Sequence, residues 1–257
     1  TAAAVALPFV VPSSVLAGAG NASPNNRITI GCIGVNSMGT MDMQGFLQFD
    51  DVQVVAVCDV DALHRKRAKG IVETYYSNKN AKADYKGCNC YNDFREVLAR
   101  DDIDAVIIAT PDHWHVPISI AAAKAGKDIY CEKPLSYDIR EGVAMVNSAE
   151  KAGNIVQLGF QRRQSEAFKK VKELLDNGRI GNLHQVSAQI HYNPDLPDTA
   201  IQPPPASLDW EEWCGPAPKL EYRPNIGHKA WRLEKEYGNG HLVDWGIHHI
   251  DIIRRIM

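Results

Sequence analysis

Residues 28–39 read ITIGCIGVNSMG. The first six are mostly apolar and β-branched, which is typical of a strand buried in a parallel sheet. Gly34 follows directly, and the run to Gly39 has the position and spacing of a G-x-G-x-x-G turn. We therefore expect a strand, a tight turn and a helix in this order, with the amino end of the helix open to a pyrophosphate group.

The turn departs from the full pattern at Asn36, which stands where the second glycine belongs. Asparagine adopts positive φ more readily than most residues, so the turn can persist with a side chain beside the phosphates. Taken alone, the pattern fits an ordinary strand-to-helix turn equally well. The candidate cofactor-binding residues of this turn are Gly34, Val35, Asn36, Ser37, Met38 and Gly39.

The chain around this turn alternates apolar runs with helical periodicity. Three more buried strands are expected, at residues 52–60, 104–110 and 127–132. Helices are expected from Asp61 to about Tyr76, over 93–100 with Asn92 as cap, between Pro117 and Gly126, and from Asp138 to Ala152. This order predicts an α/β fold, with a Rossmann-type doubly wound parallel sheet over residues 27–153.

From residue 154 the pattern becomes mixed. Residues 154–160 are typical of one more strand, and 168–175 of an amphipathic helix closed by Gly178. Residues 183–193 alternate in the manner of a half-solvated strand. Between Pro194 and Pro218 lie seven of the fourteen prolines, so we expect an irregular stretch there. We therefore expect a second α/β domain over 154–257.

Composition narrows the classes of function. With 45% hydrophobic and 23% charged residues, the 257-residue chain is typical of a folded globular protein. Its net charge of -3 gives no basic field for nucleic acid, which leaves a small-molecule partner. Neither the His113/His115 pair nor Cys88 and Cys90 has a spacing that fixes four ligands, so no metal site is expected.

The first 26 residues carry no charge and include an apolar stretch followed by small residues. This composition favours an export signal, and hence a periplasmic or cell-surface protein, over a linker-like arm on a cytoplasmic one. No stretch of the sequence is long and apolar enough to span a bilayer.

Asp59 stands at the carboxyl end of the second expected strand, 25 residues after Gly34. A carboxylate there would meet the ribose hydroxyls of an adenosine and repel a 2'-phosphate, which favours NAD. The nearby His64, Arg65 and Arg67 leave NADP open. The alternative is that Asp59 is a helix cap or a surface ion-pair partner.

The run ATPDHWHVPISIAAAKAGKDIYCEKP, residues 109–134, carries a specific resemblance. Its Thr110-Pro111, His115 and Glu132-Lys133-Pro134 resemble the glucose-fructose oxidoreductase/inositol dehydrogenase (Gfo/Idh/MocA) family in order and spacing. The resemblance continues through residues 159–163, 178–181, Trp231-Arg232, Gly240 and the run from Asp244 through His248 to Asp251. It covers nearly the whole chain from Arg27.

The resemblance implies a Rossmann domain followed by an α/β domain with an open, mostly antiparallel sheet, through which a homo-oligomer would form. It also implies a nicotinamide cofactor and a sugar or cyclitol substrate. The implied catalytic residues are Lys133, Asp244 and His248. Further cofactor-binding candidates are Thr110, Pro111, His113, His115, Glu132 and Lys133. Substrate-binding candidates are Lys133, Arg162, Trp231, Arg232, Asp244 and His248.

The chemistry of these residues is consistent with those roles. Asp244 and His248 are four apart, so on one helix they would share a face. Imidazole titrates near neutral pH and can take the proton of a secondary alcohol, while the Lys133 ammonium stabilises the developing alkoxide. The alternative is that Lys133 is an ordinary surface lysine and that His248 is a histidine of the core or surface, neither with a catalytic role.

Three functions follow from these features. The first is an NAD(P)-dependent oxidoreductase acting on a secondary hydroxyl of a sugar or cyclitol, with its cofactor retained. The second is a lyase or glycosidase that oxidises a sugar transiently, and the third is a non-catalytic sugar-binding protein. Since Met257 falls inside an expected helix, we also expect a fragment that lacks strands of the second domain.

Overall fold

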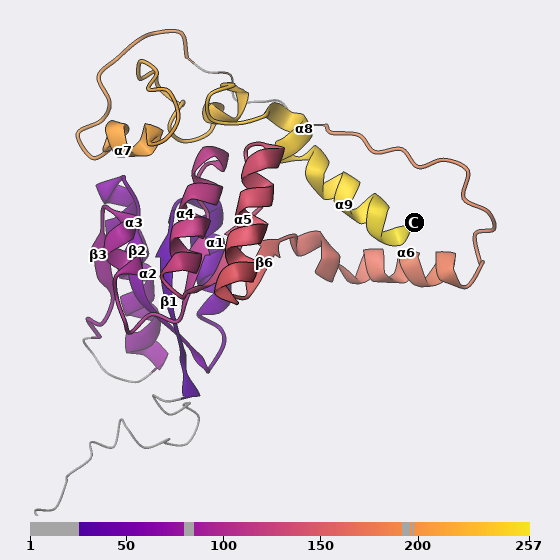
Figure 1. Ribbon diagram of the computed structural model, residues 1–257, viewed down its shortest axis with the longest axis horizontal. Helices are drawn as coiled ribbons and strands as arrows, with labels where there is room; N and C mark the ends of the chain where they lie inside the picture. The colour runs from indigo at the N-terminus through magenta and orange to yellow at the C-terminus, as the bar shows by residue number, and fades with distance from the viewer. Residues whose placement is uncertain (1–25, 80–84, 192–195, 197) are drawn as a thin grey trace, which may run out of the picture.

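The computed structural model describes residues 26–79, 85–191, 196 and 198–257 (Figure 1). The expected export segment lies outside these ranges except for its last residue. Within the described ranges, no helix combines the length and apolarity needed to cross a membrane. The same ranges hold no cluster of three or more His, Cys, Asp or Glu residues placed to bind a metal ion.

A single six-stranded sheet, in which every pairing is parallel, is the main scaffold of the described chain. Its strands are β1 (Ile28–Ile33), β2 (Val52–Cys58), β3 (Asn89–Tyr91), β4 (Ala105–Ile108), β5 (Asp128–Glu132) and β6 (Val156–Gly159). The order β3-β2-β1-β4-β5-β6 is that of a doubly wound dinucleotide-binding fold. The predicted Rossmann sheet is therefore confirmed.

Helices cover both faces of this sheet. They are α1 (Ser37–Phe46), α2 (Ala62–Lys79), α3 (Phe94–Leu98), α4 (Asp112–Lys124) and α5 (Ile139–Ala152). Met43 of α1 and Val72 of α2 pack into one core with β1 and β2. Val97 of α3, Ala122 of α4 and Met145 of α5 pack into the other, on the face turned to the viewer in Figure 1. The carboxyl ends of the strands are left open between these layers.

Three local features differ from the sequence-based expectation. β3 is not among the strands expected from the sequence, and it forms because β2 offers a free edge at Ala56–Cys58. α4 begins at Asp112 rather than at Pro117, since its buried face overrides the preference of proline for a first turn. α3 is capped by Asp93, whose carboxylate accepts from the Arg95 N–H, and not by Asn92.

The rest of the described chain consists of short elements. These are α6 (Glu166–Asp176), α7 (Trp210–Cys214), α8 (Gly240–Asp244), α9 (Gly246–Ile256) and two 3₁₀ turns, η2 (Gln161–Gln164) and η3 (Ala230–Leu233). β6 was assigned to a second domain, but it pairs with β5 in the first sheet. The division of the chain at residue 154 remains a prediction.

The strand expected at residues 183–193 is wrong for 183–191, and 192–193 lie outside the described residues. These residues are mostly exposed and have no strand hydrogen bonds, because no described strand pairs with them to complete a ladder. The mostly antiparallel second sheet, and oligomerisation through it, therefore remain predictions.

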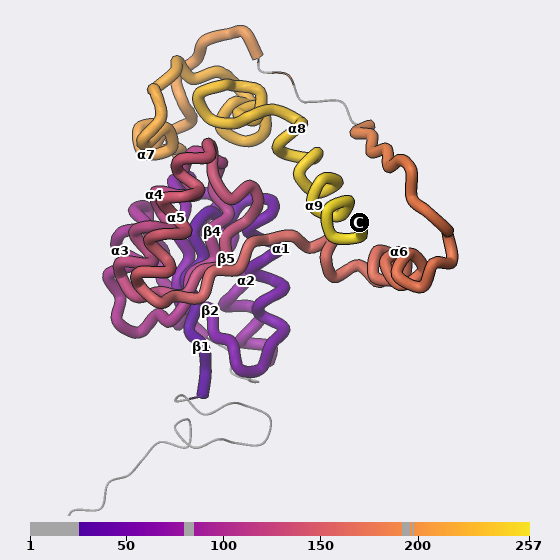
Figure 2. Tube along the Cα trace, turned by 45° about the vertical axis from the view of Figure 1, so that its right-hand side comes forward, coloured from indigo at the N-terminus to yellow at the C-terminus, as the bar shows by residue number. Residues whose placement is uncertain are grey.

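Residues 207–237, here called the covering segment, lie over the carboxyl ends of the strands (Figure 2). The segment is joined to the sheet where β2 ends: Ala62 N–H donates to Ser207 O at 2.8 Å, and Asp209 N–H donates to Val60 O at 3.0 Å. Its own core is aromatic and includes Trp210, Trp213, Tyr222, Trp231 and Tyr237. The stretch between Pro194 and Pro218, which was expected to be irregular, therefore includes part of this packed covering segment.

Candidate active site

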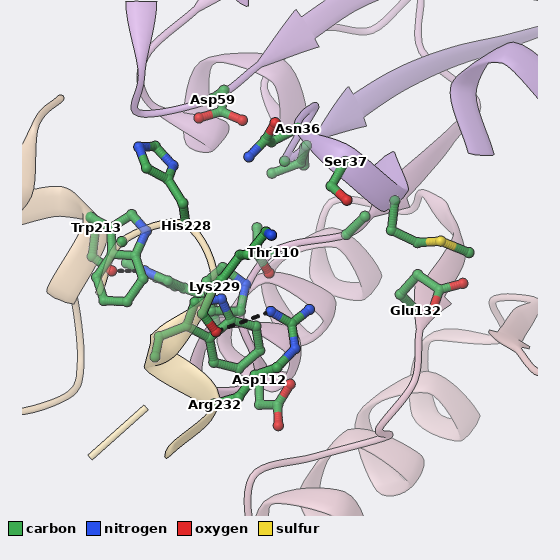
Figure 3. Close-up of a pocket in the computed structure, with 18 of the residues that line it drawn as sticks. Asn36, Ser37, Asp59, Thr110, Asp112, Glu132, Trp213, His228, Lys229 and Arg232 are labelled. Carbon is green, nitrogen blue, oxygen red and sulfur yellow. Dashed lines mark hydrogen bonds between the residues drawn. The ribbon is translucent and has the colours of Figure 1, made fainter. Parts of the chain in front are cut away.

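A cavity of about 740 Å³ lies between the strand ends and the covering segment. One wall comes from the sheet and includes Asn36, Asp59 and Lys133. The other comes from the second half of the chain and includes His228 and His248. Figure 3 shows Asp59 and Asn36 at one end and Asp112 and Arg232 at the other. The cavity is thus elongated, with distinct groups at its two ends.

The turn after β1 packs tightly against its neighbours. Gly34 has φ +80°, and a Cβ there would lie 2.7 Å from Ala109 O. Asn36 has φ -90°, so the expected positive φ at this residue is wrong. The turn instead places positive φ at Gly34 and at Ser37, with φ 27°. Since extended backbone suits any residue, Asn36 fits without strain.

Gly39 allows α1 to approach this turn, because a Cβ on it would lie 1.8 Å from Gly34 O. We expect Gly39→Ala to lower the free energy of unfolding by about 3 kcal/mol, since backbone must move to admit the methyl group. Urea unfolding measures this loss. Gly45→Ala in the same helix meets nothing within 4 Å and should stabilise by about 0.5–1 kcal/mol. Equal effects of the two substitutions would contradict this interpretation.

Asp59 forms the wall of the cavity beyond β2. Its carboxylate accepts from the backbone N–H of Val35 at 2.9 Å and from that of Asp61 at 2.9 Å. It therefore holds the turn after β1 as well as facing the cavity. Arg65 donates to Asn92 Oδ1 at 2.6 Å and Arg67 donates to Asn36 Oδ1 at 3.0 Å. Both arginines thus already have protein acceptors, which favours NAD over a cofactor with a 2'-phosphate.

Lys133, directly after β5, binds a residue from the far end of the chain. Its ammonium donates to Asp244 Oδ1 at 2.6 Å and to Asp244 O at 2.8 Å. Arg232 Nε lies 2.9 Å from Asp244 Oδ2. Burial alone would raise the pKa of Asp244, but the charges of Lys133 and Arg232 outweigh this and lower it. Asp244 is therefore an ionised anchor for two cations.

His248 faces the same cavity from α9 and is 6% exposed. Its Nδ1 is buried and has no hydrogen-bond partner among the described residues. Burial lowers the pKa of His248 to about 4, and the charges of Lys133 and Arg162 lower it in the same direction. The imidazole is therefore neutral at pH 7, the form that can accept a proton.

Asp244 and His248 do not share one continuous helix, as their spacing predicted. α8 ends at Asp244, α9 begins at Gly246, and Trp245 between them has φ -104° and ψ -40°. Both side chains nevertheless line the cavity, because the break keeps the two short helices against the same wall.

Two side chains of the sheet wall hold buried polar atoms. Thr110 Oγ1 has no hydrogen-bond partner among the described residues, and the carboxylate of Glu132, which is 4% exposed, has only the Tyr130 hydroxyl and the Lys133 N–H beside it. Burying such atoms without partners costs free energy, so they are suited to a polar ligand. Together with the turn after β1, they fit the hydroxyl and amide groups of a nicotinamide dinucleotide.

The other predicted site residues divide into two groups. Ser37, Met38, Pro111, Arg162, Trp231 and Arg232 line the cavity, as do Gly34, Thr110 and Glu132. The guanidinium of Arg232 lies 4.4 Å from the centre of the Trp231 ring. Val35, Gly39, His113 and His115 are not among the lining residues, and the first two shape the turn from behind.

His113 and His115 lie within the packing of α4 and do not line this cavity. A cofactor bound in the cavity would therefore not make the contacts predicted for them. His113 Nε2 lies 3.0 Å from Trp213 O, and its ring packs against Trp213 and Tyr237. Burial lowers its pKa to about 4. The His115 ring contacts backbone carbonyls on both sides.

Sequence reasoning missed Asp112, which lines the cavity beside the Lys133–Asp244–Arg232 cluster and is 6% exposed. Burial raises its pKa to about 7; Lys133 and Arg232 lower it, and Asp244 raises it further. The available signal was its position, directly after Thr110-Pro111 at a strand end. His228 was also missed, since the covering segment has no recognisable pattern.

Comparisons with known proteins agree with this geometry. The model of an oxidoreductase family with an NAD-binding Rossmann fold matches residues 28–160, and that of the GFO/IDH/MocA C-terminal domain matches residues 168–257. A myo-inositol 2-dehydrogenase of Thermotoga maritima is 32% identical over 183 residues, which are 70% of this chain and 47% of that protein.

Solved structures are also similar. One is scyllo-inositol dehydrogenase from Lactobacillus casei with bound NAD(H) and scyllo-inositol, with a TM-score of 0.53, 26% identity and coverage of 61% of this chain and 43% of that one. Another is a probable dehydrogenase from Thermotoga maritima, with a TM-score of 0.57, 26% identity and coverage of 90% and 55%.

The chain spans about half the length of the curated relatives it matches. The matched families cover both the sheet and the covering segment, and so include the residues of both cavity walls. The chain, with an NAD-binding Rossmann domain at residues 28–160, therefore belongs to the Gfo/Idh/MocA family of oxidoreductases.

Proposed function

We propose that this protein is an NAD-dependent oxidoreductase that acts on a secondary hydroxyl of a sugar or cyclitol. The observation that carries the proposal is the convergence of Lys133 and His248, from the two walls of one cavity that the turn after β1 also lines. The named relatives include a myo-inositol and a scyllo-inositol dehydrogenase, which supports a polyhydroxylated ring as the class of substrate.

In the proposed reaction, different residues bind the cofactor, stabilise the developing charge and take the proton. NAD supplies a hydride acceptor when bound, and Gly34, Asp59 and Glu132 are placed to hold it. Two of the three Lys133 N–H groups donate to Asp244, so the third can donate to the substrate oxygen and stabilise the charge that develops there. The His248 imidazole takes the hydroxyl proton, since it is neutral and its residue lines the same cavity.

The proposal is tested by incubating the protein with NAD and a panel of cyclitols, aldoses and glycosides while absorbance reports NADH. Net reduction of NAD by one class of polyol is the expected result. Cleavage of a glycoside without accumulation of NADH would instead identify a lyase or glycosidase that returns the hydride to its substrate. Saturable sugar binding without turnover would identify a non-catalytic sugar-binding protein.

We also propose that the cofactor remains bound between turnovers. The covering segment supports this, because its Leu208, Trp213 and His228 line the same cavity as Asp59. Protein purified without added nucleotide should therefore release NAD on denaturation, as detected by mass spectrometry. Nucleotide-free protein with an affinity of about 1 μM or weaker would contradict retention.

A further inference from the structure

His115 contacts a backbone carbonyl with each of its ring nitrogens. It lies on α4, is 1% exposed and does not line the cavity. Its Nδ1 lies 2.7 Å from Pro134 O, and its Nε2 lies 2.9 Å from Thr110 O. Both distances are those of good hydrogen bonds.

A carbonyl oxygen only accepts hydrogen bonds, and neutral imidazole has a single N–H. In a neutral His115, the unprotonated ring nitrogen would therefore direct its lone pair at a carbonyl oxygen in a buried site. The doubly protonated ring donates to both carbonyls and leaves neither unsatisfied. We infer that His115 is a buried imidazolium that ties the loop carrying Lys133 to the end of β4.

The two carbonyls belong to the segments that form the sheet wall of the cavity. Thr110 follows β4, and Pro134 directly follows Lys133. By joining them, His115 fixes the backbone from which Lys133 reaches Asp244. Because a displacement of about 1 Å at a reacting group can cost about 10²-fold in rate, this is a positioning role for the reaction proposed above, on which it rests.

The surroundings of His115 are consistent with a single positive charge. The titratable group facing it from β5 is the Cys131 thiol, and on α4 its neighbour His113 is held neutral. Burial pulls the pKa of His115 down, but Cys131 and the Pro134 and Thr110 carbonyls outweigh it and leave the pKa above its ordinary value. The charge of His115 in turn lowers the pKa of His113.

The direct test is the nitrogen NMR spectrum of the histidine rings in the whole protein at pH 7.5, without cofactor. The His115 signals are identified by their loss in His115→Gln. The expected result is two protonated ring nitrogens with similar shifts. One protonated and one unprotonated nitrogen, as in a neutral ring that accepts from Cys131, would overturn the inference whether or not the protein proves to be a dehydrogenase.

A second test uses the pH dependence of stability. A histidine whose pKa rises on folding stabilises the protein below its unfolded pKa of about 6.5, and this contribution is lost as pH rises through the folded pKa. The difference in melting temperature between the wild type and His115→Gln should therefore narrow between pH 6 and pH 9. A difference that stays constant with pH would contradict a charged ring.

Kinetics separate positioning from packing. We expect His115→Gln to lower kcat by about 10-fold to 10²-fold with little change in the KM for NAD, and His115→Phe, which has no donor, to lower it further. The control is Ser119→Ala, one turn away on α4, also fully buried and outside the cavity. For each variant, the loss of kcat is compared with its loss of stability. If this ratio is the same for His115→Gln and Ser119→Ala, the positioning role is overturned.

Discussion

Replacing Lys133 by methionine should lower kcat for polyol oxidation about 10³-fold. The methionine keeps most of the side-chain volume but removes the ammonium that would donate to the substrate oxygen, a loss of the size found when a preorganised donor is deleted from an active site. The measurement is steady-state NADH formation with saturating NAD. Binding of NAD itself, followed by calorimetry, should change little, because Asp59 and Asn36 lie at the end of the cavity away from Asp112 and from Arg232, which shares Asp244 with Lys133.

The substitution also removes one cation from Asp244, so stability must be measured alongside activity. Asp244 keeps its contact with Arg232, which should preserve the ionised carboxylate. Lys151→Met on the exposed face of α5 is the matched control, with the same chemical change far from the cavity. If Lys133→Met retains more than about one tenth of the wild-type kcat, Lys133 does not stabilise the transition state as proposed.

Replacing His248 by alanine should lower kcat/KM by about 10²-fold to 10⁴-fold, the usual contribution of a general base. The pH profile should also change. Because burial holds the pKa of His248 at about 4, the wild-type base is competent from well below neutral pH upward. The acid limb of the wild-type kcat/KM profile should therefore lie near pH 4 and not near 6.5, and it should be absent in the variant.

His249 provides the control for this experiment. It is adjacent in sequence and lies 3.3 Å, through Nδ1, from Arg162 Nη1, but it is not among the residues that line the cavity. His249→Ala should therefore retain the acid limb. An acid limb near pH 6.5 that survives in His248→Ala would show that another group takes the hydroxyl proton.

The sheet and the cofactor end of the cavity could be predicted because their signals are local. The β-branched runs and Gly34 specify the strands and the turn after β1 without reference to distant residues. The conformation of Asn36 could not be predicted, since the positive φ lies at Gly34 and Ser37 in a turn against which α1 packs closely. Residue preferences do not determine such packing.

The substrate end depends on contacts that span the chain. Lys133 and Asp244 meet across 111 positions, and the covering segment that encloses them has no periodic pattern. The shifted pKa of Asp112 arises from burial and from charges on three separate segments. A linear sequence carries no measure of burial, so the pKa shift of Asp112 could not be predicted although its position at a strand end was visible. For the same reason His115 was expected to contact the cofactor and not the backbone that it holds.

A crystal structure of the protein with NAD and an oxidisable polyol tests the central claim most directly. We predict that the dinucleotide lies along the strand ends, with its adenosine beside Asp59 and its nicotinamide ring beside Lys133 and His248. The reacting hydroxyl should then contact both Lys133 Nζ and the imidazole of His248. A cofactor bound elsewhere, or a polyol that contacts neither group, would contradict the account.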